Sequence, residues 1–434
     1  MRFYYLDAGL VTYDHHSNDC RYIVGEVRAR GLEALVFANA GIDSAPRSEL
    51  SATPHFRVYT YAEADADPVC GWLTGFERTA NVIYEDLLRL PAPKAGDIVF
   101  MSSVSPAQLV AIAAWLAAIP AARRPCAVLE MVSHGLRLGQ GAPGWKVPHP
   151  LIDPRPTLLR YASHRLRQQH GLRLNFISFT ATLAHLFGEL LQAPVQLAPL
   201  PYRAVNPLRN RAGARPIVVA ILGHHKLRKG YDKLPEIAAR LLAVHADIRL
   251  LVQAVSPADA PDAIGALRHL AAGDDRLTLC EQVAGREGWP RLLEKSDLIL
   301  CAYRPEFHLA GFSAVAAEAL ANGIPTVLPG GSPMAKWLEE CGGGGTTFDR
   351  FEANEIGTAV ERALDNFDRY ATLAYTGGLA WPTIRGPARL LDAVMALARR
   401  DDQLTAPDES SVPPAPGRRP NRAERRAAKR YHRP

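Results

Sequence analysis

Several features that mark particular protein classes are scarce or missing in this chain. Its six cysteines (Cys20, Cys70, Cys126, Cys280, Cys301 and Cys341) show no paired spacing, which argues against a zinc site or a disulfide framework. The longest apolar run, residues 109–122, contains Pro120 and is shorter than the roughly 20 residues that cross a bilayer. We therefore expect buried free thiols and no membrane-spanning helix.

Three further patterns are missing. The first residues lack the charged, apolar and small-residue order of a signal peptide, so a cytoplasmic location is expected. No short repeat period appears, which argues against a solenoid. No Asp-x-Asp pair stands at the end of an expected strand, and we therefore expect no metal ion at the site.

The basic charge is concentrated at the C-terminal end. From Arg418 onward, eight lysines and arginines oppose one glutamate, so this segment has a net charge of +7. Because the whole chain has a net charge of +6, the residues before Arg418 sum to −1. The preceding Pro- and Ser-rich residues predict a disordered linker. Such a tail suits an anionic membrane surface, such as the inner face of the cell membrane, or acts only as a solubilising tail. No base-reading platform accompanies it, so no specific nucleic-acid partner is expected.

Apolar runs alternate with helical patterns along the whole chain, which predicts α/β architecture with parallel sheets. Strands are expected near residues 2–7, 34–38, 97–101, 126–131, 174–179, 217–222, 248–252, 277–280, 298–302, 326–328 and 346–348. Helices are expected near residues 21–30, 75–90, 106–119, 155–169, 181–192, 231–244, 262–271, 288–295, 313–321, 334–340 and 354–366.

With 434 residues, the chain is long enough for two domains. A proline-rich stretch without periodicity separates the two halves and predicts a linker. The expected boundaries are residues 1–200 for the first domain, 201–215 for the linker, 216–375 for the second domain, 376–400 for C-terminal helices and 401–434 for the tail. The apolar spacing of residues 385–397 suits a plain terminal helix or one that crosses back to the first domain.

The most informative segment is an expected helix with glycine near both ends. Gly311 and Ser313 leave backbone N–H groups uncrowded at the helix start, where the helix dipole favours phosphate. Glu318 follows about one and a half turns later, within reach of a ribose whose phosphates sit at that start. An ordinary helix with a solvated Glu318 is the alternative interpretation.

A second motif follows the first strand of the second half. It runs from Gly223 and His224 to Lys229 and Gly230, and places an ammonium group where it can neutralise a diphosphate. Arg228 is a further cation in this turn. The alternative is a solvated basic turn.

In order and spacing, the two motifs resemble those of retaining GT-B glycosyltransferases of the family 4-like, group 1 type. The family's Gly-Phe-Gly is matched by Gly311-Phe312-Ser313, its second Glu by Glu318, and its Lys-Gly by Lys229-Gly230. The resemblance implies two Rossmann-like domains whose parallel sheets face each other across a cleft. It implies a hexosyltransferase-type enzyme of polysaccharide or glycoconjugate biosynthesis, which uses a UDP- or GDP-sugar as donor, retains the anomeric configuration and needs no cofactor.

The resemblance also implies site residues. Lys229, His134 and Glu318 would be catalytic, with Glu318 binding the ribose hydroxyls. Gly9, His224, Arg228, Gly311, Phe312 and Ser313 would join Lys229 and Glu318 in binding the donor, and His15 and His16 would face the acceptor. A surface role is the alternative for His134.

Three positions depart from the family pattern. The family's first Glu falls on Ala310, its Arg on His224 and its second Gly on Ser313. Glu306 could replace the missing carboxylate from a flexible loop, although a solvent-facing Glu306 is the expected arrangement. The departures leave a second reading open, a GT-B-like nucleotide-binding or scaffold protein without transfer activity.

Overall fold

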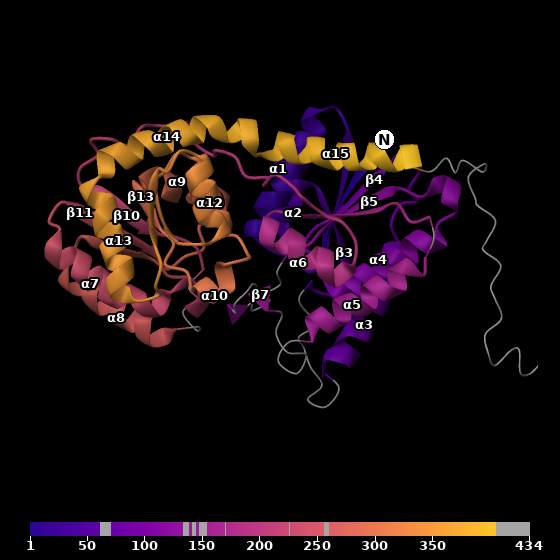
Figure 1. Ribbon diagram of the computed structural model, residues 1–434, viewed down its shortest axis with the longest axis horizontal. Helices are drawn as coiled ribbons and strands as arrows, with labels where there is room; N and C mark the ends of the chain where they lie inside the picture. Colours follow the sequence, from indigo (N-terminus) through magenta and orange to yellow (C-terminus); the bar gives the residue numbers. More distant parts are fainter. Residues whose placement is uncertain are drawn as a thin grey trace, which may run out of the picture.

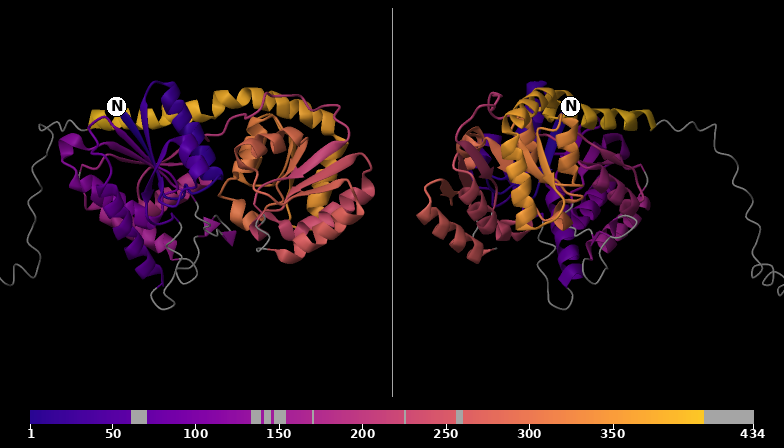
Figure 2. Two further views of the ribbon diagram at one scale, coloured as in Figure 1. Left: turned by 180° about the vertical axis from the view of Figure 1, so that it is seen from behind. Right: turned by 60° about the vertical axis from the view of Figure 1, so that its left-hand side comes forward.

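The computed structural model of the chain describes residues 1–60, 71–132, 139–140, 145–146, 154–169, 171–224, 226–255 and 260–404. Of the predicted tail, residues 401–404 continue a helix, and residues 405–434 lie outside the described part of the chain, as do His134 and, in the second motif, His225. The described chain forms two lobes, each built around a parallel sheet, and two long C-terminal helices run along one side of both lobes (Figures 1 and 2).

The first domain contains a seven-stranded sheet within the described residues. In spatial order its parallel strands are β3 (Ala52–Phe56), β2 (Glu33–Asn39), β1 (Arg2–Asp7), β4 (Ile98–Met101), β5 (Cys126–Glu130), β8 (Leu174–Ser178) and β9 (Val195–Leu197). Its helices are α1 (His15–Ala29), α2 (Ser44–Leu50), α3 (Gly71–Leu88), α4 (Pro106–Ala118), α5 (Arg155–Arg167) and α6 (Ala181–Leu191). The short strands β6 (Gly139–Gln140) and β7 (Trp145–Lys146) pair separately.

The second domain contains a six-stranded parallel sheet within the same described residues. Its strands in spatial order are β12 (Leu277–Cys280), β11 (Ile248–Gln253), β10 (Ile217–Ile221), β13 (Leu298–Leu300), β14 (Thr326–Pro329) and β15 (Gly345–Phe348). Its helices are α7 (Leu234–Val244), α8 (Pro261–Gly273), α9 (Gly285–Lys295), α10 (Pro305–His308), α11 (Ala314–Ala321), α12 (Pro333–Glu340) and α13 (Ala353–Asp365). The predicted α/β class with two parallel sheets is confirmed.

The central strands are apolar because helices cover both faces of each sheet. All four residues of β4 and all three of β13 are buried. Side-chain alternation is therefore absent from these strands, and the unbroken apolar runs in the sequence are what a parallel sheet requires. Both sheets direct the carboxyl ends of their strands toward the same space between the lobes, where open α/β sheets bind ligands.

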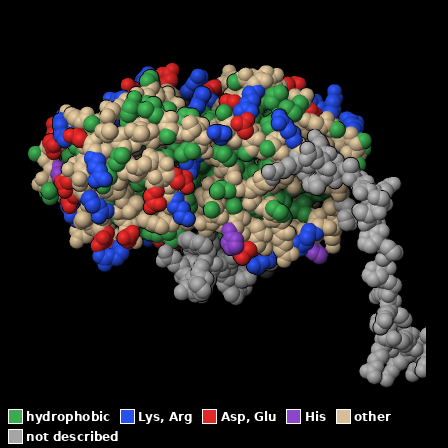
Figure 3. Space-filling view, turned by 45° about the horizontal axis from the view of Figure 1, so that its top comes forward, with side chains coloured by type: hydrophobic (Ala, Val, Ile, Leu, Met, Phe, Trp, Pro, Cys, Tyr) green, Lys and Arg blue, Asp and Glu red, His purple; other side chains and the backbone are tan. Residues whose placement is uncertain are grey.

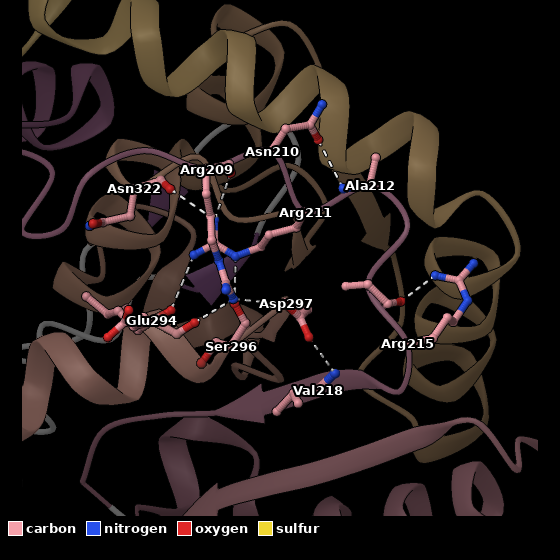
Figure 4. Close-up of polar contacts among 12 residues, drawn as sticks. Arg209, Asn210, Arg211, Ala212, Arg215, Val218, Glu294, Ser296, Asp297 and Asn322 are labelled. Carbon is pink, nitrogen blue, oxygen red and sulfur yellow. Dashed lines mark hydrogen bonds and ion pairs between the residues drawn. The ribbon is translucent and has the colours of Figure 1, made fainter.

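The connection between the domains is fixed to the second domain by a buried arginine. Residues 198–216, all described, contain no helix or strand. Arg211 is 5% exposed, and its guanidinium donates to the backbone oxygens of Ser296 at 2.8 Å and Asn322 at 3.3 Å (Figure 4). These carbonyls follow the C-terminal ends of α9 and α11, where the helix dipole is negative. Burial and nearby Arg209 lower the pKa of Arg211 to about 10, which leaves it charged at neutral pH.

Asn322, the residue after α11, ties the same linker to that helix. Its Oδ1 accepts from the backbone N–H groups of Val205 at 3.1 Å and Asn206 at 3.3 Å, and its Nδ2 donates to the Glu318 carbonyl at 2.8 Å. The linker therefore holds the helix that carries Glu318.

The C-terminal helices α14 (Phe367–Ile384) and α15 (Pro387–Leu404) belong to different lobes (Figure 1). Helix α14 packs on α11 of the second domain, whereas α15 packs on α1 and β5 of the first. The Trp381 indole donates to the Tyr202 carbonyl at 2.8 Å, and Arg30 pairs with Asp392 at 2.7 Å. Helix α15 thus returns the chain to the first domain.

The surface over these helices mixes both signs of charge. Figure 3 shows basic and acidic side chains interspersed with apolar patches on that face, in keeping with the near-neutral charge of the chain before its tail. None of the described helices combines the length and apolarity that a bilayer span demands.

Candidate functional site

A cleft of about 800 Å³ lies between the domains and is lined by residues from both. The first domain contributes the segments that follow β1, β4 and β5, and the second contributes those that follow β10 and β13 together with the start of α11. We call this space the interdomain cleft.

The turn after β10 wraps around Lys229. Gly223 has a φ of +103°, and a Cβ there would lie 2.5 Å from Lys229 Nζ. Gly230 has a φ of +75°, and a Cβ there would lie 1.8 Å from the Ala302 carbonyl oxygen. Only glycine fits both positions without displacing the backbone or the ammonium group. The two glycines of the second motif therefore fix the Lys229 side chain against the wall of the cleft.

Lys229 is an uncompensated cation. It is partly buried, lines the cleft, and has no carboxylate within ion-pair distance among the described residues. Burial and the neighbouring Arg228 lower its pKa to about 8. A partly buried ammonium without a counter-charge is a complementary site for an anion such as a phosphate.

Lys226 and Arg228 add positive charge around Lys229, and His224 lies beside them. All three line the cleft. Burial, followed by Lys229 and Lys226, lowers the pKa of His224, which is therefore neutral at pH 7. Arg228 is exposed. The predicted basic turn thus faces the cleft as a group.

The start of α11 meets the same region. Gly311, Phe312 and Ser313 line the cleft. Ser313 is the N-cap of α11, because its side chain accepts from the backbone N–H of Ala316, and the Tyr303 hydroxyl lies 2.9 Å from Ser313 Oγ. The serine at this departure from the family pattern therefore caps the helix, and the positive end of the helix dipole points into the cleft.

Glu318 lies deeper along α11 and is 1% exposed. Its Oε1 accepts from the Tyr22 hydroxyl at 2.9 Å, and its Oε2 accepts from the Trp289 indole at 2.6 Å. Burial raises its pKa to about 7, although both hydrogen bonds favour the carboxylate. Because each carboxylate oxygen has a second lone pair, Glu318 can also accept from a ligand hydroxyl.

Ala310, which stands where the family has its first Glu, is a buried packing residue. Ala310 is 4% exposed and packs with the core of the first domain, and its carbonyl accepts from the Thr180 hydroxyl at 2.6 Å. Glu306 faces solvent, with its carboxylate 3.7 Å from Arg304. His308, between them, lines the cleft and stacks on Tyr303, with ring centroids 4.4 Å apart.

Of the site residues predicted in the first domain, His15 lines the cleft, whereas Gly9 and His16 lie behind its wall. His15 is exposed to the cleft that it lines, and desolvation between the cleft walls, followed by His16 and Lys229, lowers its pKa well below the usual value. His16 is buried beneath Gly9, and its Nδ1 lies 3.0 Å from Asp7 Oδ2. Gly9 is required there, since a Cβ would lie 2.5 Å from the His16 ring. Neither Gly9 nor His16 is among the described residues that line the cleft.

Other cleft residues were not predicted from the sequence. Gln253, the last residue of β11, accepts from the Gly223 N–H at 2.7 Å and so supports the Lys229 turn. Glu130, the last residue of β5, also lines the cleft. A polar residue at the carboxyl end of an apolar strand was a usable signal for both. Tyr22, Trp289 and Asp19 lie within helices, where no such signal marks them.

Comparison with known proteins identifies the fold. No protein-family profile matches the sequence, and no curated protein sequence matches it. Among solved structures, Anabaena HepE in complex with UDP is 16% identical and aligns over 93% of this chain and 99% of its own, with a TM-score of 0.57. The sucrose-phosphate synthase of Thermosynechococcus elongatus is 13% identical over 93% and 98%, with a TM-score of 0.58. WaaG, a glycosyltransferase involved in lipopolysaccharide biosynthesis, is 14% identical over 91% and 99%, with a TM-score of 0.57. The chain has the GT-B fold, in which two Rossmann-like domains face each other across a cleft.

Proposed function

We propose that this protein is a glycosyltransferase that moves a sugar from a nucleotide-diphosphate sugar to an acceptor, with retention and without a metal ion. The observation that carries the proposal is the meeting of Lys229 and the α11 N-terminus in one cleft, with Glu318 farther along the same helix. Similarity to GT-B proteins, one of them solved with UDP, supports it.

Each of these groups has a role in the proposed reaction. Lys229 and the amides at the α11 start would bind the diphosphate and stabilise the charge that develops on it as the sugar leaves. Preorganised charge of this kind lowers barriers by several kcal/mol when water is excluded. Glu318 would accept hydrogen bonds from the ribose hydroxyls.

Lys229 and the helix dipole supply the positive charge that a metal ion supplies in other nucleotide-sugar enzymes. Within the described residues, no group of three or more His, Cys, Asp and Glu side chains could hold a metal ion. In a retaining transfer, the departing phosphate would take the proton of the acceptor hydroxyl, so that no protein base is required.

A donor panel tests the proposal. The protein would be incubated with UDP-, GDP- and ADP-sugars, and nucleotide release would be measured, with the anomeric configuration of any product determined by proton NMR. We expect one nucleotide class to be turned over and the product to keep the donor's configuration. Tight nucleotide binding without release from any donor would instead favour a nucleotide-binding or scaffold protein.

We also propose that the basic tail, which lies outside the described residues, draws the protein to an anionic membrane surface. Its eight cations motivate this, at about 1 kcal/mol per residue near such a surface. A lipid-linked acceptor would suit that location.

A further inference from the structure

Two buried carboxyl groups stand on the first-domain side of the cleft. Asp19, on α1, is 5% exposed, and Glu130, at the end of β5, is 2% exposed. Both line the cleft, opposite the second-domain residues that would bind the donor. We call Asp19 and Glu130, together with Thr60 of the same domain, which also lines the cleft, the acidic wall.

His16, a positively charged group close to the acidic wall, is already paired with another carboxylate. His16 is held by Asp7, with Nδ1 and Oδ2 3.0 Å apart. Although burial disfavours its cation, the Asp7 charge raises the pKa of His16 to about 10. The two groups therefore neutralise each other, while Asp7 Oδ1 accepts from the Gly9 N–H at 2.8 Å. The remaining carboxyls, Asp19 and Glu130, have no lysine or arginine within ion-pair distance in the described part of the chain.

The wall is also short of hydrogen-bond donors. Glu130 Oε2 accepts from the Ser102 hydroxyl at 2.7 Å. Asp19 Oδ1 and Thr60 Oγ1, by contrast, are buried and make no hydrogen bond of normal geometry within the described residues, although the Tyr202 hydroxyl faces the Asp19 carboxyl. Thr60 is 1% exposed and is itself uncharged, so it marks an unfilled polar position independently of the two acids. Buried polar atoms are normally paired, and unpaired ones in a cleft wall indicate a missing ligand group.

The charges around the wall define that group. Burial raises the pKa of Asp19 well above its usual value, and the Glu130 charge raises it further; burial raises the pKa of Glu130 to about 7. His15, one turn before Asp19 on α1, has a strongly lowered pKa and is neutral, so it supplies no counter-charge. The two raised pKa values show that the carboxylate forms lack a compensating charge, and a bound cation would favour those forms.

We propose that the acidic wall is an acceptor subsite for a protonated amine, so that the acceptor is an amino sugar or another ammonium-bearing molecule. The assignment rests on the proposed glycosyltransferase function. An ammonium group carries three donors and one positive charge, which match Asp19 Oδ1, Thr60 Oγ1 and the uncompensated carboxyls. A hydroxyl would supply one donor and no charge.

Binding measurements separate this inference from the proposed function. Saturation-transfer NMR titrations at pH 7, with UDP present, would compare D-glucosamine, N-acetyl-D-glucosamine and D-glucose. N-Acetylation removes the charge while keeping the ring, so it is the matched ligand control. We expect glucosamine to bind at least about tenfold more tightly than the other two, equivalent to about 1.4 kcal/mol.

The variants Asp19→Asn and Glu130→Gln should abolish the glucosamine preference and leave UDP affinity unchanged. Glu85→Gln is the matched control, because Glu85 is 61% exposed and pairs with Arg57 on the surface. Thermal melts of each variant would verify folding. Equal affinity for the three sugars in the unmodified protein would overturn the inference, as would a preference that survives in both cleft variants. Absence of UDP binding would count against the proposed function itself.

Discussion

Replacing Lys229 by methionine should weaken nucleotide binding and stabilise the fold at the same time. Methionine has nearly the length of lysine, so it can occupy the space against Gly223 where Nζ lies, but it carries no charge. A charge-assisted hydrogen bond to phosphate contributes about 1.5–3 kcal/mol, so the Kd for UDP should rise roughly 10- to 150-fold.

The pH dependence of binding gives a second signature. Because the pKa of Lys229 is about 8, its ammonium is present at pH 7 and is lost as the pH rises through 8. The UDP affinity of the unmodified protein should therefore fall between pH 8 and 9.5, whereas that of Lys229→Met should stay nearly constant. Isothermal titration calorimetry from pH 6.5 to 9.5 measures both effects.

The stability effect has the opposite sign. Folding lowers the pKa of Lys229 from 10.5 to about 8, so its ammonium destabilises the folded state. This cost is fully present below pH 8 and disappears as the pH rises toward 10.5. Lys229→Met should raise the Tm at pH 7, and the gain should shrink above pH 8.

Lys233→Met is the matched control. Lys233 lies one turn further along the chain, 3.9 Å from Asp232, and is not among the described cleft residues. It should change neither UDP affinity nor its pH dependence. Unchanged UDP affinity in a folded Lys229→Met variant would refute the placement of the diphosphate.

Four further predictions follow from the same structure. Glu318→Gln should weaken UDP but not inorganic pyrophosphate in calorimetry, because only UDP carries the ribose; equal losses for both would contradict a ribose contact. Arg211→Met should lower the free energy of unfolding by about 2–4 kcal/mol in urea titrations, because it leaves several buried carbonyls unpaired; a loss under 1 kcal/mol would show that the linker is held otherwise. EDTA should leave turnover intact, and activity that is abolished by chelation and restored by manganese would refute metal independence. Deleting residues after Asp402 should preserve turnover of soluble substrates and remove salt-sensitive pelleting with anionic vesicles; equal pelleting of both forms would exclude the membrane role.

Much of the fold could be predicted because buried parallel strands are apolar throughout. β1 has the predicted bounds, and most central strands agree within a residue or two. The edge strand β3 was not predicted, since it contains Pro54 and two of its five residues are buried. Helix α14 begins at Phe367, before the expected C-terminal helices at 376. Its Gly377-Gly378 pair disfavours a helix by propensity, but a Cβ at Gly377 would lie 2.2 Å from the Cys341 carbonyl, so close packing requires glycine there.

The candidate site divides in the same way, according to how many chain segments build each part. The Lys229 turn and the α11 start are formed largely by consecutive residues, so their glycines, cap and charges leave a readable spacing in the sequence. Tyr22 and Glu318, which form a hydrogen bond, are 296 residues apart in the sequence, so their contact depends on how α1 packs against α11. Asp19, Thr60 and Glu130 come from three separate segments of the first domain and share no spacing. The donor side could therefore be predicted from motifs, whereas the acidic wall exists only once the sheet has brought the ends of β1, β3 and β5 together, and it is there that acceptor choice would be decided.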